Sequence, residues 1–373
     1  MPRTEVGSSE DLIGELLEWV RIESPTTDPA AVNRVMDLAE GELARAGAAI
    51  TRIPGRDGFG DNLIARTAGD GAPIVVAGHL DTVWEHGSLA HMPARIDGAK
   101  ATGPGIYDMK AGSFLGMHVM RAMLRQGVRA RRPVVLLLTP DEEVGSPTSR
   151  DLIEREAAGA RAVLIMEPAG AGGACVTARK GVGRFTLRVA GRGAHAGGAF
   201  QDGASAIVEL AHQIKAIHDM VDLPRGITLN VAPVWGGTRP NVIPPEAGCE
   251  IDLRVARAED GEEMVERLLA LAANHPECRV TVEGGMNRPP FAETAEIAAL
   301  HEHARTLAAE IGFDLPKQTR GGGSDGNFTA ALGVPTLDGL GCPGGGAHVA
   351  SENILWRQLA PRAALLAGLL ETL

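Results

Sequence analysis

The sequence predicts an α/β protein with a mixed, largely parallel sheet flanked by helices and a smaller domain inserted into it. Two observations support this prediction. In the first part of the chain, short apolar runs bounded by Pro and Gly alternate with amphipathic helical segments, as in layered α/β proteins. From about residue 179, strand and helix patterns follow in the order βαββαβ, which is the ferredoxin-like arrangement.

The first domain is predicted to begin with two amphipathic helices. Residues 9–23 carry apolar side chains at helical spacing after a polar, acidic start, and residues 29–46 repeat the pattern until Gly47 ends it. A later helix is expected over 110–126. Strands are expected over residues 48–53, 62–67, 74–77, 133–139 and 162–166.

The inserted domain is expected over residues 179–287, between catalytic-domain segments 1–178 and 288–373. Its predicted elements are a strand at 184–189, a helix at 203–218, strands at 227–234 and 247–255, a helix at 260–274 and a strand at 279–283. The α/β pattern then resumes after Pro289-Pro290, with helices over 295–311 and 352–370.

Composition narrows the class of protein. The net charge of −11 argues against a nucleic-acid partner. The first ten residues lack the apolar core of a signal peptide, and no apolar stretch is long enough to span a membrane, so a cytoplasmic protein is expected. Without a C-x-x-C pair, four reduced thiols are expected at Cys175, Cys249, Cys278 and Cys342.

Acidic and histidine residues follow the predicted strands. In open α/β sheets the ligand crevice lies beyond the carboxyl ends of the strands, so these side chains should gather at one rim. They are His79 after 73–78, Glu142 and Glu143 after 133–139, Glu167 after 162–166, His348 after a glycine loop, and Asp108 in a glycine-rich turn. Two imidazoles and this set of carboxylates at one rim predict a two-metal site.

Asp81 lies two residues beyond His79, so both side chains point to the same side and the carboxylate can hold the imidazole ring. Taken alone, the His79–Asp81 pair is more typical of a hydrogen bond at the end of a strand. The acidic run at 141–143, taken alone, is more typical of a solvated turn. Their position directly after apolar strands favours the metal site, because acids at an interior rim need a partner or a metal.

Five motifs carry a family resemblance: GHLDTV at 78–83, GPGIYDMKAG at 103–112, DEEVGS at 141–146, MEP at 166–168 and GAHAG at 193–197. Together they closely resemble the M20 metallopeptidases, most of all the bacterial glutamate carboxypeptidases, alongside acetylornithine deacetylase and succinyl-diaminopimelate desuccinylase. The resemblance implies a zinc-exopeptidase-like catalytic domain and a ferredoxin-like lid that also forms a homodimer.

The resemblance also implies the ligand set. Asp108 would bridge two zinc ions per chain, with Co²⁺ or Mn²⁺ as substitutes. His79 and Glu167 would complete one metal site, and Glu143 and His348 the other.

The implied catalytic roles are those of a metal-assisted hydrolase. Glu142 would be the general base that passes a proton from water to the leaving amine, and Asp81 would orient His79.

In the inserted domain, His195 resembles the histidine that reaches a partner subunit's active site, and Asn241 resembles a lid residue that contacts substrate. Arg288 resembles the arginine that binds the substrate's α-carboxylate, for which a guanidinium is well shaped. Arg320 is a second candidate for that role or a surface ion pair. Three positions depart from the family pattern, and they bear on the substrate side chain rather than on the metal ligands. These positions are Met109, Phe200 and Val349.

The expected function is a dizinc hydrolase that cleaves a peptide or N-acyl bond in a small substrate and releases an amino acid with a free α-carboxylate. A deacylase of the acetylornithine deacetylase type is the alternative. A non-catalytic binding homologue is a further hypothesis, which Glu142 and the complete ligand set argue against. A nucleotide-binding enzyme, suggested by Gly321-Gly322-Gly323, is not supported, because neither phosphate-binding glycine motif is present.

Overall fold

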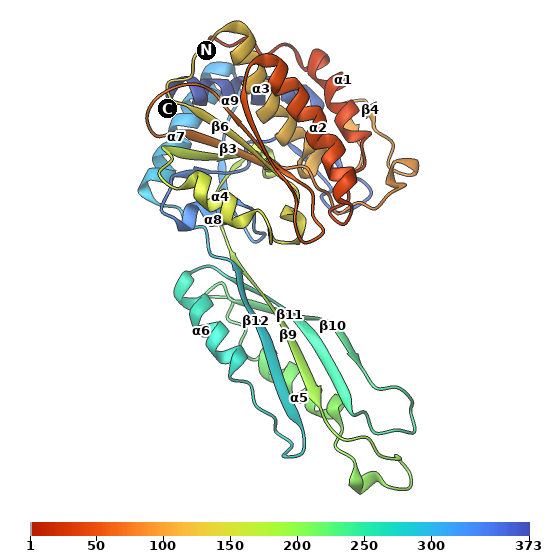
Figure 1. Ribbon diagram of the computed structural model, residues 1–373. Helices are drawn as coiled ribbons and strands as arrows, with labels where there is room; N and C mark the ends of the chain where they lie inside the picture. Colours follow the sequence, from red (N-terminus) through yellow and green to blue (C-terminus); the bar gives the residue numbers. More distant parts are fainter. Residues whose placement is uncertain (1) are drawn as a thin grey trace. The chain divides into compact units, whose positions relative to one another are not determined.

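The computed structural model describes residues 2–373 and divides them into two compact units (Figure 1). The core unit comprises residues 2–178, 293–319 and 324–373, and the inserted unit comprises Arg179–Ala292 and Arg320–Gly323. The inserted unit therefore ends later than residue 287, the boundary expected from the sequence. The reason is that its last strand runs through Arg288, and Phe291 then pairs with Arg179.

The core unit is built on a six-stranded mixed sheet of order β1-β2-β6-β3-β7-β14. β3 pairs in parallel with β6 and β7, and β14 is parallel to β7, whereas β1 and β2 are antiparallel to their neighbours. The strands are β1 (Ala49–Ile53), β2 (Asn62–Arg66), β3 (Ile74–His79), β6 (Val134–Thr139), β7 (Ala162–Ile165) and β14 (Thr336–Leu337). The predicted mixed, largely parallel sheet is confirmed.

Helices cover both faces of this sheet (Figure 1). One face packs against α1 (Ser9–Val20), α2 (Pro29–Ala46), α3 (Ala111–Gln126), α7 (Ala295–Ile311) and α9 (Leu359–Thr372). The other packs against α4 (Arg150–Ala157) and α8 (Gly326–Ala331). Val76 and Leu136 face the first layer, and their neighbours Val75 and Val135 face the second. Burial on both faces explains why these strands are continuously apolar.

A small four-stranded sheet, of order β15-β16-β5-β4, was not predicted. It consists of β4 (Arg95–Asp97), β5 (Lys100–Thr102), β15 (Gly344–Gly345) and β16 (Asn353–Ile354). Because β16 pairs with β5, the chain after residue 352 is extended, and α9 begins at Leu359. The helix predicted over 352–370 was therefore wrong at its start. Two further strands, β8 (Cys175–Arg179) and β13 (Lys317–Arg320), pair with each other.

The inserted unit has the order βαββαβ, with antiparallel strands arranged β10-β11-β9-β12. Its elements are β9 (Gly181–Ala190), α5 (Ala206–His218), β10 (Thr228–Gly236), β11 (Glu246–Val255), α6 (Ala258–Leu269) and β12 (Arg279–Arg288). The apolar residues of the strands and of both helices form a separate core. β10 is an edge strand and exposes Val234 and Trp235.

Within residues 2–373, every helix is too short or too polar to pass through a lipid bilayer.

Candidate metal centre

Three neighbouring strands deliver the first candidate ligands. β3 ends at His79, which lies opposite Thr139 of β6 in parallel register. On the other side, Ala77 lies opposite Ile165, so continuing this register places Glu167 level with His79. The turn after β6 carries Glu142 and Glu143. Because the three strands are parallel neighbours, their carboxyl ends open onto the same rim of the sheet.

Asp108 reaches this rim from the turn that precedes α3. The turn enters through Gly105 (φ 70°), and the Asp108–Met109 peptide is cis. Gly112, in the first turn of α3, lies against the backbone before Glu167, since a Cβ there would lie 1.7 Å from Met166 O. This close approach lets the start of α3 meet the end of β7, which brings Asp108 to the ligands of the strand ends.

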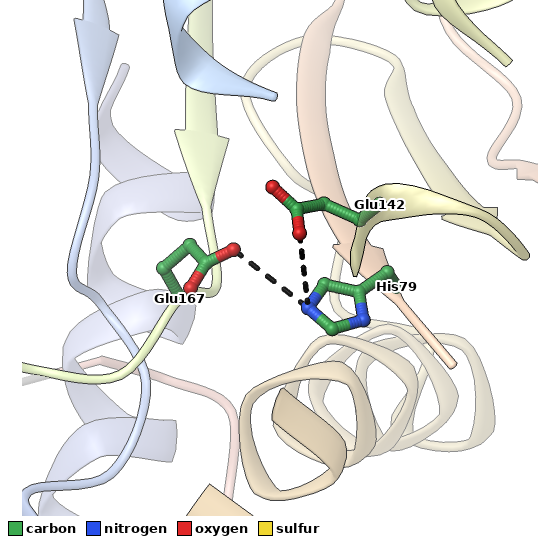
Figure 2. A group of neighbouring side chains, drawn as sticks. All are labelled: His79, Glu142 and Glu167. Carbon is green, nitrogen blue, oxygen red and sulfur yellow. Dashed lines mark ion pairs between the residues drawn. The ribbon is translucent and has the colours of Figure 1, made fainter. Parts of the chain in front are cut away.

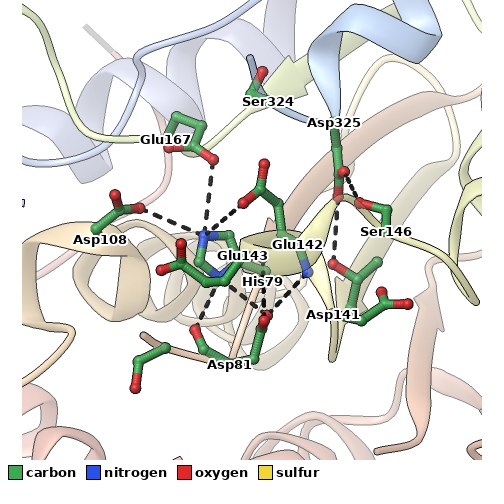
Figure 3. Close-up of polar contacts among 12 residues, drawn as sticks. His79, Asp81, Asp108, Asp141, Glu142, Glu143, Ser146, Glu167, Ser324 and Asp325 are labelled. Atoms are coloured by element: carbon green, nitrogen blue, oxygen red, sulfur yellow. Dashed lines mark hydrogen bonds and ion pairs between the residues drawn. The ribbon is translucent and has the colours of Figure 1, made fainter. Parts of the chain in front are cut away.

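One group of ligand atoms surrounds Nε2 of His79. That nitrogen lies 3.8 Å from Glu167 Oε1 and 4.0 Å from Glu142 Oε2 (Figure 2). It also lies 3.5 Å from Asp108 Oδ1 (Figure 3). Tetrahedral zinc with bonds of about 2.1 Å separates its ligand atoms by about 3.4 Å. The distance to Asp108 is close to that of two atoms that share a metal ion, whereas the distances to Glu167 and Glu142 are longer. All three are too long for strong direct hydrogen bonds.

A second group surrounds Nε2 of His348. This nitrogen lies 3.4 Å from Asp108 Oδ2 and 3.2 Å from Glu143 Oε2. The two oxygens of Asp108 therefore face different histidines, Oδ1 toward His79 and Oδ2 toward His348. A carboxylate in this position can bridge two metal ions.

Two buried atoms of the site have no hydrogen-bond partner among residues 2–373. They are Nε2 of His79 and Oε1 of Glu143. A buried polar atom without a partner is costly, and a metal ion would satisfy both. Four carboxylates also surround the Nε2 atoms of only two imidazoles, so a divalent cation would offset their negative charge. Imidazole nitrogen and carboxylate oxygen are a donor set that suits zinc.

Asp81 supports this site in two ways (Figure 3). Nδ1 of His79 lies 3.0 Å from the backbone oxygen of Asp81 and 3.2 Å from its Oδ1, so Nε2 is directed toward the ligands. The Asp81 carboxylate also accepts hydrogen bonds of 3.2 Å from the backbone nitrogens of both Glu142 and Glu143, and one of 2.8 Å from Thr26 Oγ1. The sequence predicted only the contact with His79.

Further buried acids hold the same turn and were missed by the sequence analysis. Asp141 accepts bonds of 2.7 Å from both the backbone nitrogen and the hydroxyl of Thr148. Asp325 accepts a bond from the hydroxyl of Ser146, which has a positive φ of 57° (Figure 3). In the sequence, Asp141 and Asp325 are marked only as acids that follow a predicted strand or a glycine run. That pattern is too common to identify a residue of the site.

The electrostatics of the site follow from its carboxylates. Burial alone would lower the pKa of His79, but the carboxylates of Asp108 and Asp81 raise that pKa well above its usual value. The neighbouring carboxylates of Asp108 and Glu143 raise the pKa of His348 to about 10. Burial raises the pKa of Glu143. Without a cation, the imidazoles therefore hold protons, and a metal ion would have to displace them.

The four other predicted site residues belong to the inserted unit. His195 and Asn241 lie on adjacent exposed loops, joined by a 3.0 Å bond from Ala196 N to Asn241 O. Nδ1 of His195 accepts bonds from the backbone nitrogens of Gly197 and Gly198, at 3.1 and 3.0 Å, which leaves Nε2 to carry the proton.

The two candidate arginines differ in burial. Arg288, at the end of β12, is 4% exposed, whereas Arg320 is partly exposed. The aliphatic part of Arg288 lies beneath Gly323, where a Cβ would come within 2.8 Å of Arg288 Cδ.

The fold and the donor set together define a metal-dependent hydrolase with its site at the carboxyl edge of an α/β sheet. The chain belongs to the peptidase family M20/M25/M40, whose model matches residues 75–372. It is therefore a metallopeptidase or amidohydrolase, and the resemblance found in its motifs is confirmed.

Among curated relatives, the chain is 32% identical to carboxypeptidase G2 from Pseudomonas sp. strain RS-16, over 96% of this chain and 88% of that protein. It is 28% identical to a succinyl-diaminopimelate desuccinylase from Cupriavidus taiwanensis, over 82% of this chain and 83% of that protein.

Solved structures share the fold. The aminopeptidase PepT of Bacillus cereus superposes with a TM-score of 0.81 at 24% identity, covering 98% of this chain and 99% of its own. An M20 family metallo-carboxypeptidase from Sulfolobus solfataricus superposes with a TM-score of 0.74 at 16% identity, covering 97% and 100%.

Proposed function

We propose that this enzyme is a dizinc carboxypeptidase that cleaves an amide bond and releases an amino acid with a free α-carboxylate. The observation that carries this proposal is the position of Asp108, whose two oxygens face two different histidines. His79 and Glu167 would complete one metal site, and Glu143 and His348 the other. The similarity to carboxypeptidase G2 supports the carboxypeptidase subtype.

Two zinc ions bound here would supply the Lewis acidity that activates water and polarises the scissile carbonyl. Glu142 would take the proton from the attacking water and deliver it to the leaving amine. Its carboxylate reaches the rim beside Nε2 of His79, while its backbone nitrogen is held by Asp81. Asp81 would thus keep both the base and the His79 ring in place during the reaction.

His195 would donate a hydrogen bond to the negative oxygen that develops on the scissile carbonyl. Two backbone N–H groups occupy its Nδ1, so its outward atom is the Nε2 donor that this task requires. We propose that it acts in the site of a partner subunit. The inserted unit offers an edge strand, β10, and exposed apolar side chains at Ile207 and Val208 of α5 and at Trp235, which fit a homodimer interface.

Substrate recognition would fall to the inserted unit. Asn241, hydrogen-bonded through its backbone to the loop of His195, would contact the substrate beside the scissile bond. Arg288 would pair with the α-carboxylate of the departing amino acid, and Arg320 is the second candidate. An N-acyl-amino-acid deacylase remains the alternative function, favoured by the similarity to succinyl-diaminopimelate desuccinylase.

Metal analysis followed by a substrate screen tests this proposal. The purified enzyme should contain about two divalent ions per chain. When loaded with zinc, it should hydrolyse N-acyl-glutamates and dipeptides faster than N-acetylornithine or N-succinyl-diaminopimelate. Preference for the last two substrates would support the deacylase instead. A protein that binds no tight metal, or that hydrolyses none of these amides, would overturn both functions.

A further inference from the structure

Glu352 is a buried carboxylate beside the candidate metal centre that has no part in the mechanism above. It lies between His348 and strand β16, and only 1% of its surface is exposed. Neither a metal-ligand role nor a substrate role was predicted for it from the sequence.

The side chain of Glu352 accepts hydrogen bonds from four N–H donors. Oε1 accepts hydrogen bonds from the backbone nitrogens of Tyr107, at 2.8 Å, and Asp108, at 3.0 Å. Oε2 accepts from the backbone nitrogen of Gly105, at 2.9 Å, and from Nε1 of Trp84, at 2.6 Å. Four donors fill the acceptor capacity of a carboxylate.

Glu352 and its partners belong to three segments, each of which carries a candidate ligand. Three of the donors lie in the turn 105–108, which ends at Asp108. Trp84 follows the strand that ends at His79, and Glu352 itself lies four residues after His348. A single side chain thus ties together the segments that deliver His79, Asp108 and His348.

The loop that carries His348 is exposed and has an unusual backbone conformation. The His348 side chain is 53% exposed, and its backbone has a positive φ of 61°, which L-residues rarely adopt. Packing around the imidazole therefore does little to fix the loop. The bonds of Glu352 supply an anchor within the same segment, directed at the turn of Asp108.

We propose that Glu352 is a positioning residue that sets the separation of Asp108 and His348 and thereby the affinity of the metal site they share. This inference rests on the proposed dinuclear function. Glutamine at position 352 keeps the shape but replaces one oxygen with an NH₂ donor. Since each oxygen faces two N–H groups, either orientation of the amide brings donor against donor.

The test measures metal binding directly. Zinc is titrated into metal-free wild type and Glu352→Gln in competition with a chromophoric chelator, and cobalt(II) absorption spectra report the ligand geometry. The variant should bind one of its two ions about 10- to 100-fold more weakly, the usual effect of removing an outer-shell partner. Its cobalt spectrum should also change.

Glu371→Gln is the matched control. Glu371 accepts backbone N–H bonds from Arg3, at 2.8 Å, and Thr4, at 2.9 Å, in the same unit, but these bonds hold the amino-terminal segment to α9. This variant should melt at a lower temperature and bind both ions as the wild type does. A loss of affinity confined to Glu352→Gln therefore separates positioning of the site from general loss of stability.

Trp84→Phe keeps the test decisive if Glu352→Gln does not fold, because it removes only one donor. It should weaken the same ion about tenfold. Wild-type affinity for both ions in whichever of these variants folds would overturn the role of Glu352 and leave the dinuclear function intact. A wild type that binds fewer than two ions would instead overturn the dinuclear function itself.

Discussion

Replacing Asp81 with asparagine should weaken the metal centre without altering any ligand. The carboxylate is fully buried, and both of its oxygens accept hydrogen bonds. Oδ1 faces Nδ1 of His79 and the backbone nitrogen of Glu142, each at 3.2 Å. Oδ2 faces the backbone nitrogen of Glu143, at 3.2 Å, and the hydroxyl of Thr26, at 2.8 Å.

The amide nitrogen of asparagine should take the Oδ2 position, because a hydroxyl accepts as readily as it donates. The N–H of Glu143 then loses its acceptor. A buried N–H without an acceptor costs about 1–3 kcal/mol, which corresponds to about 5- to 150-fold. The Asp81→Asn variant should lose zinc affinity and kcat/KM by a factor in this range.

Chelator competition and steady-state hydrolysis of an N-acyl-glutamate measure the two losses. Thr26→Val alone should have a small effect, because Asp81 keeps its other three bonds. In the Asp81→Asn background, Thr26→Val should add a further loss, because the new amide then has no acceptor on that side. Unchanged zinc affinity and kcat/KM in Asp81→Asn would refute the reasoning, as would a double variant no worse than Asp81→Asn.

Four further predictions concern the base, the protons, the partner subunit and the substrate. Glu142→Gln should keep its metal while kcat falls at least ~10²-fold; turnover close to wild type would mean that another group takes the proton. Zinc uptake should release protons, and the apparent affinity should fall as pH falls, because carboxylates raise the pKa of His348 to about 10 and that of His79 well above its usual value. Calorimetry in buffers of different ionisation enthalpy measures this release, and a binding heat that does not depend on the buffer would contradict it. Mixing inactive His195→Ala and Glu142→Gln chains should restore activity in one of the two sites of a mixed dimer, whereas subunit exchange without recovery would rule out action across the dimer. Arg288→Ala should lower kcat/KM by about 10²–10⁴-fold for substrates with a free α-carboxylate, since removing one partner of a buried charge pair costs about 3–5 kcal/mol; equal losses for α-carboxamide substrates would exclude this role.

The residues at the rim of the core sheet could be predicted because their positions depend on the local pattern of apolar residues. Continuous apolar runs identified the buried parallel strands, and parallel neighbours open onto one edge. The positions of His79, Glu142 and Glu167 relative to one another therefore follow from where the runs stop. The structure bears out their proximity, and their catalytic roles remain proposals.

Contacts between segments distant in sequence were not predictable in this way. The bonds that Asp81 accepts from the turn after β6 depend on the register of two strands some sixty residues apart. Glu352 was placed in a helix because apolar periodicity extends through residues 352–370. Its extended conformation depends instead on pairing of β16 with β5, about 250 residues earlier, which local periodicity does not record.

The ligands of the candidate centre come from well-separated parts of the chain, and His79 and His348 lie 269 positions apart. An unfolded chain cannot hold them together, so bound zinc would act as a crosslink that exists only in the folded protein. Each tenfold rise in free zinc above the dissociation constant of one site would stabilise the fold by about 1.4 kcal/mol. The supply of zinc in the cell would therefore help to determine how long each molecule of this enzyme escapes proteolysis.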